Sequence, residues 1–335
     1  MSFKKNLLAG LVVLGAMGLH VQAHAAATII NTSGTVALGV NDLGNLNTSV
    51  GSVAVNSSLT GLAYKFPDGS FRDATSPGCF CEGWGVSVNG SVSGYANVTT
   101  GSGGLTLSSF SSTGNSATSI VTLTSLPGLQ ITQAYSEANN APGALFKDVV
   151  TITNNTGATV NDLKFVRVMD WDVPLTEFSE YVTIKGVGST TLLERSHDNG
   201  FNTADPLGGD AAINGATVDV DFTDVGPVDH GAYFRFNFGT LADGESYTFT
   251  TFYGATGNEA SALAAIGAEG IELYSLGQSN GGEVTGEPAT FIFGFSGVGG
   301  TPVEPDPNDV PEPASLALLG VALAGLAVSR RRRVV

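Results

Sequence analysis

Two aspartates stand two residues apart in the stretch VMDWDVPLTEFSEY, near the middle of the chain. If this stretch forms a strand, Asp170 and Asp172 point to one face and Trp171 to the other, because side chains alternate along a strand. Carboxylates gathered on one face can bind Ca²⁺, which prefers oxygen ligands, and Glu177 adds a third. A pair of carboxyl groups can also catalyse glycoside hydrolysis. The remaining alternative is a solvated acidic rim around a packed tryptophan.

The loop SHDNGFNTADPLGGD adds further oxygen donors at Asp198, Asp205 and Asp210. Its Ser196-His197-Asp198 run is no catalytic triad, because consecutive side chains diverge and triads assemble across a fold. We therefore expect no catalytic residue there and no required cofactor, with Ca²⁺ as the one candidate ion. The candidate ligands are Asp170, Asp172, Glu177, Asp198, Asp205 and Asp210.

The only two cysteines, Cys79 and Cys81, lie in SPGCFCEGWG. Side chains at i and i+2 of an extended segment point the same way, so a disulfide between them is sterically accessible. An intermolecular bond and two reduced thiols are the alternatives. A zinc site is not expected, because His197 and His230 lack ligand spacing to the cysteines.

The two tryptophans, Trp84 and Trp171, have two possible roles. Each could be a packing anchor in the core. An exposed indole would instead offer a flat apolar face for stacking on a sugar ring, since aromatic rings combine a large contact area with a polar edge.

The composition indicates an acidic body built from strands. Gly is frequent, charged residues make up 13% of the chain and the net charge is −16. Residues 28–300 contain 8 basic and 26 acidic residues, which gives −18. Such a body is repelled by nucleic acid, so no nucleic-acid partner is expected.

Alternating polar and apolar residues predict strands along nearly the whole body, and the predicted fold is all-β: an antiparallel β-sandwich of Ig-like or jelly-roll-like type. We predict a hairpin in VVTITNNTGATVNDLKFVRV and one short helix at 259–268 with Asn258 as its N-cap. A sub-boundary is expected near residues 137–143. The predicted strands are Thr28–Val40, Val50–Val55, Gly85–Val88, Val92–Thr99, Leu105–Phe110, Ser119–Leu126, Leu129–Tyr135, Phe146–Thr153, Asp162–Val168, Tyr181–Lys185, Thr217–Phe222, Ala232–Phe238, Tyr247–Tyr253 and Thr290–Phe295.

The first 25 residues have the three parts of a secretory signal. Lys4 and Lys5 form a positive region, an apolar stretch follows at Leu7–Leu19, and small residues at Ala23 and Ala25 suit cleavage by signal peptidase. The chain is therefore expected to be exported.

The other end carries a short apolar segment, Ala314–Val328, bounded by arginines. Its 15 residues span about 23 Å as a helix, against roughly 30 Å of hydrocarbon. The cluster Arg330, Arg331, Arg332 and Arg333 would hold that end in the cytoplasm. We predict a transmembrane helix suited to a temporary halt in the inner membrane. The acidic, proline-punctuated segment 301–310 should form a stiff linker before it.

Pro311, Glu312 and Pro313, followed by the apolar segment and the arginine cluster, closely resemble the PEP-CTERM sorting signal of Gram-negative bacteria. The resemblance covers residues 311–335 and leaves the family of the body open. It implies recognition by an exosortase-type membrane protease, cleavage near the motif and delivery to the cell surface or the extracellular matrix. Proteins with this signal are often associated with exopolysaccharide and biofilm, so exopolysaccharide is an expected partner.

The sequence thus predicts an exported surface or matrix protein with a non-enzymatic structural or adhesive role. The alternatives are a secreted carbohydrate-binding module and a carbohydrate-active hydrolase that uses acids near Asp170.

Overall fold

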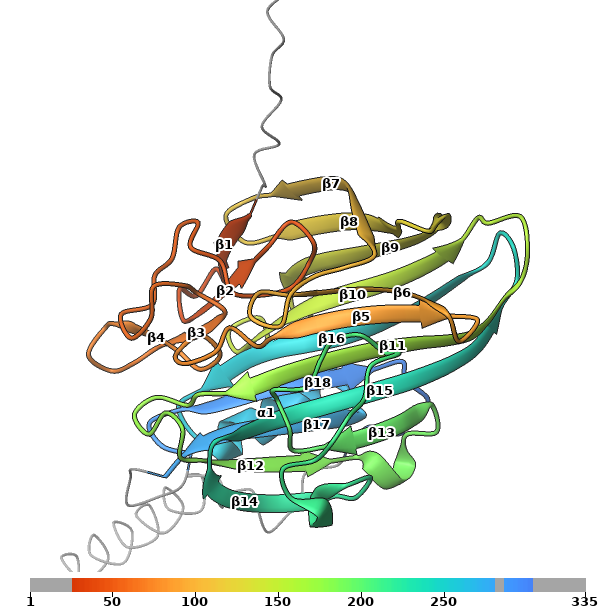
Figure 1. The fold of residues 1–335 in the computed structure, drawn as a ribbon. Coiled ribbons are helices and arrows are strands. Elements are labelled where there is room, and N and C mark those ends of the chain that lie inside the picture. The colour runs from red at the N-terminus through yellow and green to blue at the C-terminus, as the bar shows by residue number, and fades with distance from the viewer. Residues whose placement is uncertain (1–25, 281–285, 304–335) are drawn as a thin grey trace, which may run out of the picture.

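A computed structural model describes residues 26–280 and 286–303 of the chain. Strands form three antiparallel sheets, and one helix accompanies them (Figure 1). The all-β prediction is confirmed.

The smallest sheet has four strands in the order β1-β2-β3-β4 and lies near one end of the molecule (Figure 1). Where one strand was predicted over Thr28–Val40, two strands pair with each other around a turn. The segment Val50–Val55, also predicted as a strand, is mostly loop. The bounds are β1 Ala27–Ile30, β2 Val36–Val40, β3 Leu62–Lys65 and β4 Phe71–Asp73.

The largest sheet has nine strands in the order β14-β12-β17-β18-β16-β10-β9-β8-β7. Period-two burial is clear in the strands β8, β9 and β10, as in ITQAY of β9. The bounds are β7 Leu105–Ser112, β8 Ala117–Leu123, β9 Leu126–Glu137, β10 Leu145–Asn154, β12 Glu180–Lys185, β14 Phe222–Val228, β16 Ser246–Thr256, β17 Leu273–Ser279 and β18 Thr290–Ser296.

The third sheet has five strands in the order β13-β15-β11-β5-β6. In Figure 1 its strands β5, β11 and β15 run across the nine-stranded sheet. Aromatic rings fill the space between these two sheets: Phe165 of β11 meets Phe249 of β16, and Phe236 of β15 meets Phe295 of β18, with ring centroids 4.8 and 4.9 Å apart. The bounds are β5 Gly83–Val88, β6 Val92–Asn97, β11 Val160–Trp171, β13 Leu193–His197 and β15 His230–Leu241.

The predicted hairpin at 149–168 is wrong, although both of its strands exist. β10 pairs with β9 and β16 in the nine-stranded sheet, whereas β11 pairs with β15 and β5 in the five-stranded sheet. The chain therefore crosses from one layer of the sandwich to the other at residues 155–159. Asn154 supports the crossing, because its side-chain Nδ2 donates to the carbonyl oxygens of Ala158 and Leu241.

The helix α1, Glu259–Glu269, confirms the predicted helix at 259–268. Asn258 caps it by accepting a hydrogen bond from the backbone N–H of Ser261. Its buried side chains pack against residues of β16, β17 and β18 on the face of the nine-stranded sheet that the five-stranded sheet does not cover. None of the helices among residues 26–280 and 286–303 has the length and apolarity needed to cross a bilayer.

Two further predictions concern the segments 217–222 and 137–143. Thr217–Phe222 was predicted as a strand, but residues 215–217 form a 3-10 turn and β14 begins only at Phe222. The expected sub-boundary at 137–143 coincides with the connection between β9 and β10, which pair with each other in one sheet.

The remaining predictions on the ends of the chain fall outside the described residues. They concern Ala23 and Ala25 at the start, and Pro311 to Pro313, the apolar segment and Arg330 to Arg333 at the end.

Candidate cation-binding site

The end of β11 positions the two aspartates that the sequence singled out. The indole of Trp171 is buried between the sheets, and its Nε1 donates to Ser275 Oγ of β17 at 3.1 Å. Asp170 and Asp172 therefore leave the strand on the opposite side. The expectation that they share a face agrees with this alternation.

A third carboxylate reaches them from the neighbouring strand. Asp170 lies opposite Gly231 in the β11–β15 pairing, and Asp229 directly precedes β15. One carboxylate oxygen from each of Asp170, Asp172 and Asp229 lies within 4.8 Å of the other two. We call these three residues the carboxylate site. Asp229 is exposed, so the site has an open side, whereas Asp172 is fully buried.

The buried oxygens of the carboxylate site lack hydrogen-bond partners. Both carboxylate oxygens of Asp172 and Oδ1 of Asp170 accept no hydrogen bond in the structure. Burial, together with the neighbouring charges of Asp170 and Asp229, raises the pKa of Asp172 to about 9. Burial also raises the pKa of Asp170 well above its usual range. A carboxyl group in this setting must either keep its proton or be neutralised by a cation.

Glu180, the first residue of β12, lies beside the site, but unlike Asp172 it accepts hydrogen bonds. Its carboxylate accepts hydrogen bonds from the backbone N–H groups of His230 and Ser179. Burial nevertheless raises the pKa of Glu180 to about 9, and the charge of Asp172 contributes. Glu180 therefore adds a fourth carboxyl group near the site and has its own hydrogen-bond donors.

Two loops close over the site. The backbone N–H of Asp172 donates to the carbonyl of Ala74, which fastens the loop before β5 to the end of β11. From the other side, Gly200 lies directly on the backbone of β11, where a Cβ would collide with Cα of Asp170. Only glycine permits this approach.

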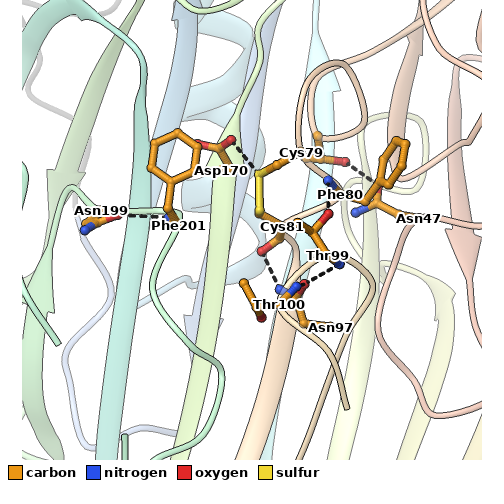
Figure 2. Close-up of a disulfide and its surroundings, with 11 residues drawn as sticks. Asn47, Cys79, Phe80, Cys81, Asn97, Thr99, Thr100, Asp170, Asn199 and Phe201 are labelled. Atoms are coloured by element: carbon orange, nitrogen blue, oxygen red, sulfur yellow. Dashed lines mark hydrogen bonds between the residues drawn. A yellow bond between two sulfur atoms is a disulfide. The ribbon is translucent and has the colours of Figure 1, made fainter. Parts of the chain in front are cut away.

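The first loop brings both cysteines to Asp170. Cys79 and Cys81 form a disulfide, and Cys79 Sγ lies 3.1 Å from Asp170 Oδ2 (Figure 2). Asn97 holds the loop by donating from Nδ2 to the carbonyl of Cys81. Figure 2 also draws Phe201, the residue after Gly200, among the surroundings of the disulfide.

The other predicted calcium ligands are placed elsewhere. Glu177 is the nearest of them, since its charge acts on Asp172, and it accepts a hydrogen bond from Asn56. Asp198 accepts from the backbone N–H groups of Ile213 and Asn214, and Asp205 accepts from that of Leu207. Asp210 is paired with Arg235 at 2.6 Å. Within the described ranges these last three carboxylates do not join Asp170 and Asp172 in a group able to share one ion.

The predicted role of the two tryptophans as a platform for sugar rings is wrong. Trp84 and Trp171 both have 0% exposure, so neither has a ring face available to a sugar. Trp84 stacks on Phe165 at 5.9 Å and donates from Nε1 to the carbonyl of Leu43. Both indoles are anchors of the core.

A second buried polar group lies between the sheets, and no sequence motif predicted it. Arg167 donates from Nε to Glu82 at 2.6 Å and from Nη1 to Gln133 at 2.6 Å, and Asp148 lies 3.6 Å from Nη1. Burial raises the pKa of Asp148 to about 7 in spite of the nearby guanidinium. We call this group the Arg167 cluster; its members are Glu82, Gln133, Tyr135, Asp148, Arg167 and Tyr253.

Comparison with known proteins identifies the end of the chain. Residues 309–333 match the family model described as the PEP-CTERM protein-sorting motif. The chain carries a PEP-CTERM sorting signal. This match confirms the resemblance noted from the sequence, and it marks the chain as an exported protein that is sorted by an exosortase.

The body of this exosortase substrate has no match among curated proteins. Among solved structures, a galactose mutarotase related enzyme from Lactobacillus acidophilus is similar over 85% of this chain and 89% of its own, with 9% identity and a TM-score of 0.30.

No sequence pattern connected Asp229 or Glu180 with Asp170 and Asp172. Asp229 stands 57 residues after Asp172, and no spacing connects them. The pairing of β11 with β15 creates the contact, and that pairing is non-local. The one available signal was the position of Asp229 three residues before the predicted strand Ala232–Phe238.

Proposed function

We propose that this chain is an exported cell-surface or extracellular-matrix protein with a non-enzymatic structural or adhesive role, and that its body binds Ca²⁺ at Asp170, Asp172 and Asp229. One observation carries the calcium proposal: Asp172 is fully buried, and both of its carboxylate oxygens lack a hydrogen-bond donor. The delivery to the cell surface of a Gram-negative bacterium, with exopolysaccharide or biofilm as its surroundings, is supported by the sorting motif at 309–333.

The chemistry of the site suits a hard cation. Three carboxylates lie within reach of one another, and Ca²⁺ accepts six to eight oxygen ligands in flexible geometry. Water can complete the shell at Asp229, where the site is exposed. A bound cation would offset the burial and the mutual repulsion that raise the pKa values of Asp170 and Asp172.

The burial of these carboxylates favours a shared ion over glycoside hydrolysis. Glycosidases place the scissile bond between their two carboxyl groups, so a sugar must reach both of them. Here Asp170 is 1% exposed and Asp172 is 0% exposed, and of the three carboxylates only Asp229 is open to solvent. The hydrolase alternative therefore has less support than a structural site.

Thermal unfolding with and without calcium tests the proposal. With a Kd of about 1 mM, 10 mM Ca²⁺ should stabilise the fold by about 1.4 kcal/mol, which corresponds to a rise in Tm of roughly 2–4 °C. Asp172→Asn should abolish the rise, because an amide cannot supply the charge. Asp205→Asn makes the same change at a carboxylate outside the site and should retain it. An unchanged Tm of the wild-type protein in calcium would overturn the calcium assignment.

A carbohydrate-binding role is the second candidate, and exposed phenylalanines support it. Phe178 is 49% exposed and Phe201 is 39% exposed. A Cβ on Gly78 would lie 2.6 Å from the Phe178 ring and 3.4 Å from Asp172 Oδ1, so ring and carboxylate adjoin the same glycine. The Phe178 ring therefore lies next to the carboxylate site. Phe201 follows Gly200, which lies on the backbone of Asp170, and both exposed rings could stack on sugars. Calcium-dependent retention on immobilised host exopolysaccharide, lost in Phe201→Ala but kept in Leu207→Ala, would support this role. Equal retention by all three proteins would argue against it.

A further inference from the structure

The disulfide and Asp170 form a second group of potential metal ligands. One carboxylate oxygen of Asp170 and the two sulfur atoms of Cys79 and Cys81 all lie within 4.8 Å of one another. Asp170 is 1% exposed, and its Oδ1 has no hydrogen-bond donor. Figure 2 shows the carboxylate aimed at the sulfur of Cys79.

We propose that reduction of the Cys79–Cys81 disulfide creates a site for a thiophilic divalent ion such as Zn²⁺, with Cys79, Cys81 and Asp170 as its protein ligands. Asp170 belongs both to this group and to the carboxylate site. The reduced protein bound to Zn²⁺ should therefore bind Ca²⁺ more weakly, a consequence that rests on the calcium proposal above.

The redox step balances with a simple reductant. A water-soluble phosphine breaks the S–S bond and becomes a phosphine oxide by taking the oxygen of one water molecule, and the two sulfurs take that water's protons. When the metal binds, both thiols lose their protons to solvent, since thiolate is the ligand form. Cys79 is only half-buried, so the reductant can reach it.

The local geometry permits chelation by both sulfurs. Two thiolates on one tetrahedral Zn²⁺ ion, each about 2.3 Å from it, stand about 3.8 Å apart. The Cα atoms of Cys79 and Cys81 are 5.2 Å apart, and both residues lie in the loop between β4 and β5. Rotation of the two side chains is therefore enough to open the bond to that separation. With Asp170 as third ligand, a water molecule can take the fourth position.

The reduced site differs in character from the carboxylate site. Sulfur ligands favour Zn²⁺ and related ions, whereas an all-oxygen shell favours Ca²⁺. The redox state of one disulfide thus determines which kind of cation this end of β11 can hold.

Cobalt titration of the full-length protein tests the new site, because Co²⁺ occupies zinc sites and gives a thiolate charge-transfer band. Phosphine-reduced protein should bind one Co²⁺ with this band, and Zn²⁺ should displace it. Oxidised protein and the reduced Cys79→Ser/Cys81→Ser variant should show no band. Asp170→Asn should weaken binding at least tenfold, whereas Asp205→Asn should not change it. A reduced wild-type protein without the band would overturn the proposal, as would equal affinity in Asp170→Asn.

The calcium proposal fails or succeeds separately. Its test uses the oxidised protein and the Tm in calcium, so a missing cobalt band leaves that test unaffected. If both sites exist, saturating Zn²⁺ should reduce the calcium-induced rise in Tm of the reduced protein and leave that of the double serine variant unchanged. An undiminished rise in the reduced wild-type protein would refute the sharing of Asp170.

Discussion

At the scale of single residues, the Arg167 cluster places one guanidinium between two buried carboxyl groups. Glu82 accepts hydrogen bonds from Arg167 Nε, from the hydroxyl of Tyr253 and from the backbone N–H of Leu46. Both oxygens of the Glu82 carboxylate therefore have a hydrogen-bond donor. Asp148 has no hydrogen-bond donor on either oxygen. A neutral Asp148 leaves the cluster without net charge, which is the arrangement that a low-dielectric interior favours.

The protonation of Asp148 predicts a pH dependence of stability. The pKa of Asp148 is about 7 in the folded protein and about 3.8 for an ordinary aspartate. Between these values the folded state holds one more proton than the unfolded state, so stability falls as pH rises. From pH 5 to pH 8 the loss should be about 2–3 kcal/mol. Asp148→Asn should remove this contribution, so that the decline measured by urea unfolding at each pH becomes shallower. The contributions of Asp172 and Glu180, whose pKa values are also raised by burial, should remain.

An exposed position provides the control for this prediction. Asp243→Asn makes the same chemical change at the surface and should leave the decline between pH 5 and pH 8 in place. If Asp148→Asn unfolds with the same pH profile as the wild-type protein, Asp148 does not carry the effect.

At the scale of elements, the packing of β11 on β17 depends on a missing side chain. Trp171 covers Gly277, where a Cβ would lie 2.6 Å from Cδ2 of the indole. This contact sets how closely the end of β11 approaches the nine-stranded sheet. Asp170 and Asp172 flank Trp171 in the chain, so the position of Trp171 also sets theirs. The carboxylate site is therefore positioned by a contact on the opposite face of its own strand.

Gly277→Ala should disturb both the core and the site. The added methyl group overpacks the sandwich, and we expect a loss of about 1–3 kcal/mol in the free energy of unfolding. Gly114→Ala is the matched control, because a Cβ there meets nothing within 4 Å and should leave stability nearly unchanged. Equal Tm values for the two variants would show that Trp171 can move aside without cost.

At the scale of the whole molecule, the expected loss of both ends during export would make the protein more acidic. The net charge of −16 includes Lys4 and Lys5 at the start and four arginines near the end. Removal of both ends leaves the acidic body, whose −18 over residues 28–300 attracts dissolved cations. The proposed calcium site would work in a compartment where millimolar Ca²⁺ is common.

Intact-mass analysis of the protein from its native cell surface tests this processing. We expect a species that begins after Ala25 and ends near Pro311, because the tail is sorted by an exosortase. Glu312→Ala should reduce the cleavage at the tail and shift the full-length tail to the membrane fraction. A wild-type chain that keeps residues 314–335 in the membrane would show that the tail is a lasting anchor.

The sequence by itself determined the features that depend on local pattern. Period-two alternation was enough for the strands β8, β9 and β10, and an asparagine before an alanine-rich run was enough for α1. The sorting motif is likewise a linear signal, because its residues follow one another in the chain at 309–333. The shared face of Asp170 and Asp172 follows from the same strand periodicity.

Only the tertiary structure decided which distant residues meet. The β10–β11 connection has the turn residues of a hairpin, yet burial of apolar faces on both layers sends its strands to different sheets. Asp229 reaches Asp170 through the register of β11 and β15, and Cys79 reaches it through the loop fastened at Ala74. Burial then gives these groups their unusual pKa values, and burial is a property of packing. Local spacing cannot encode such contacts, because each depends on chain segments brought together only when the sheets form.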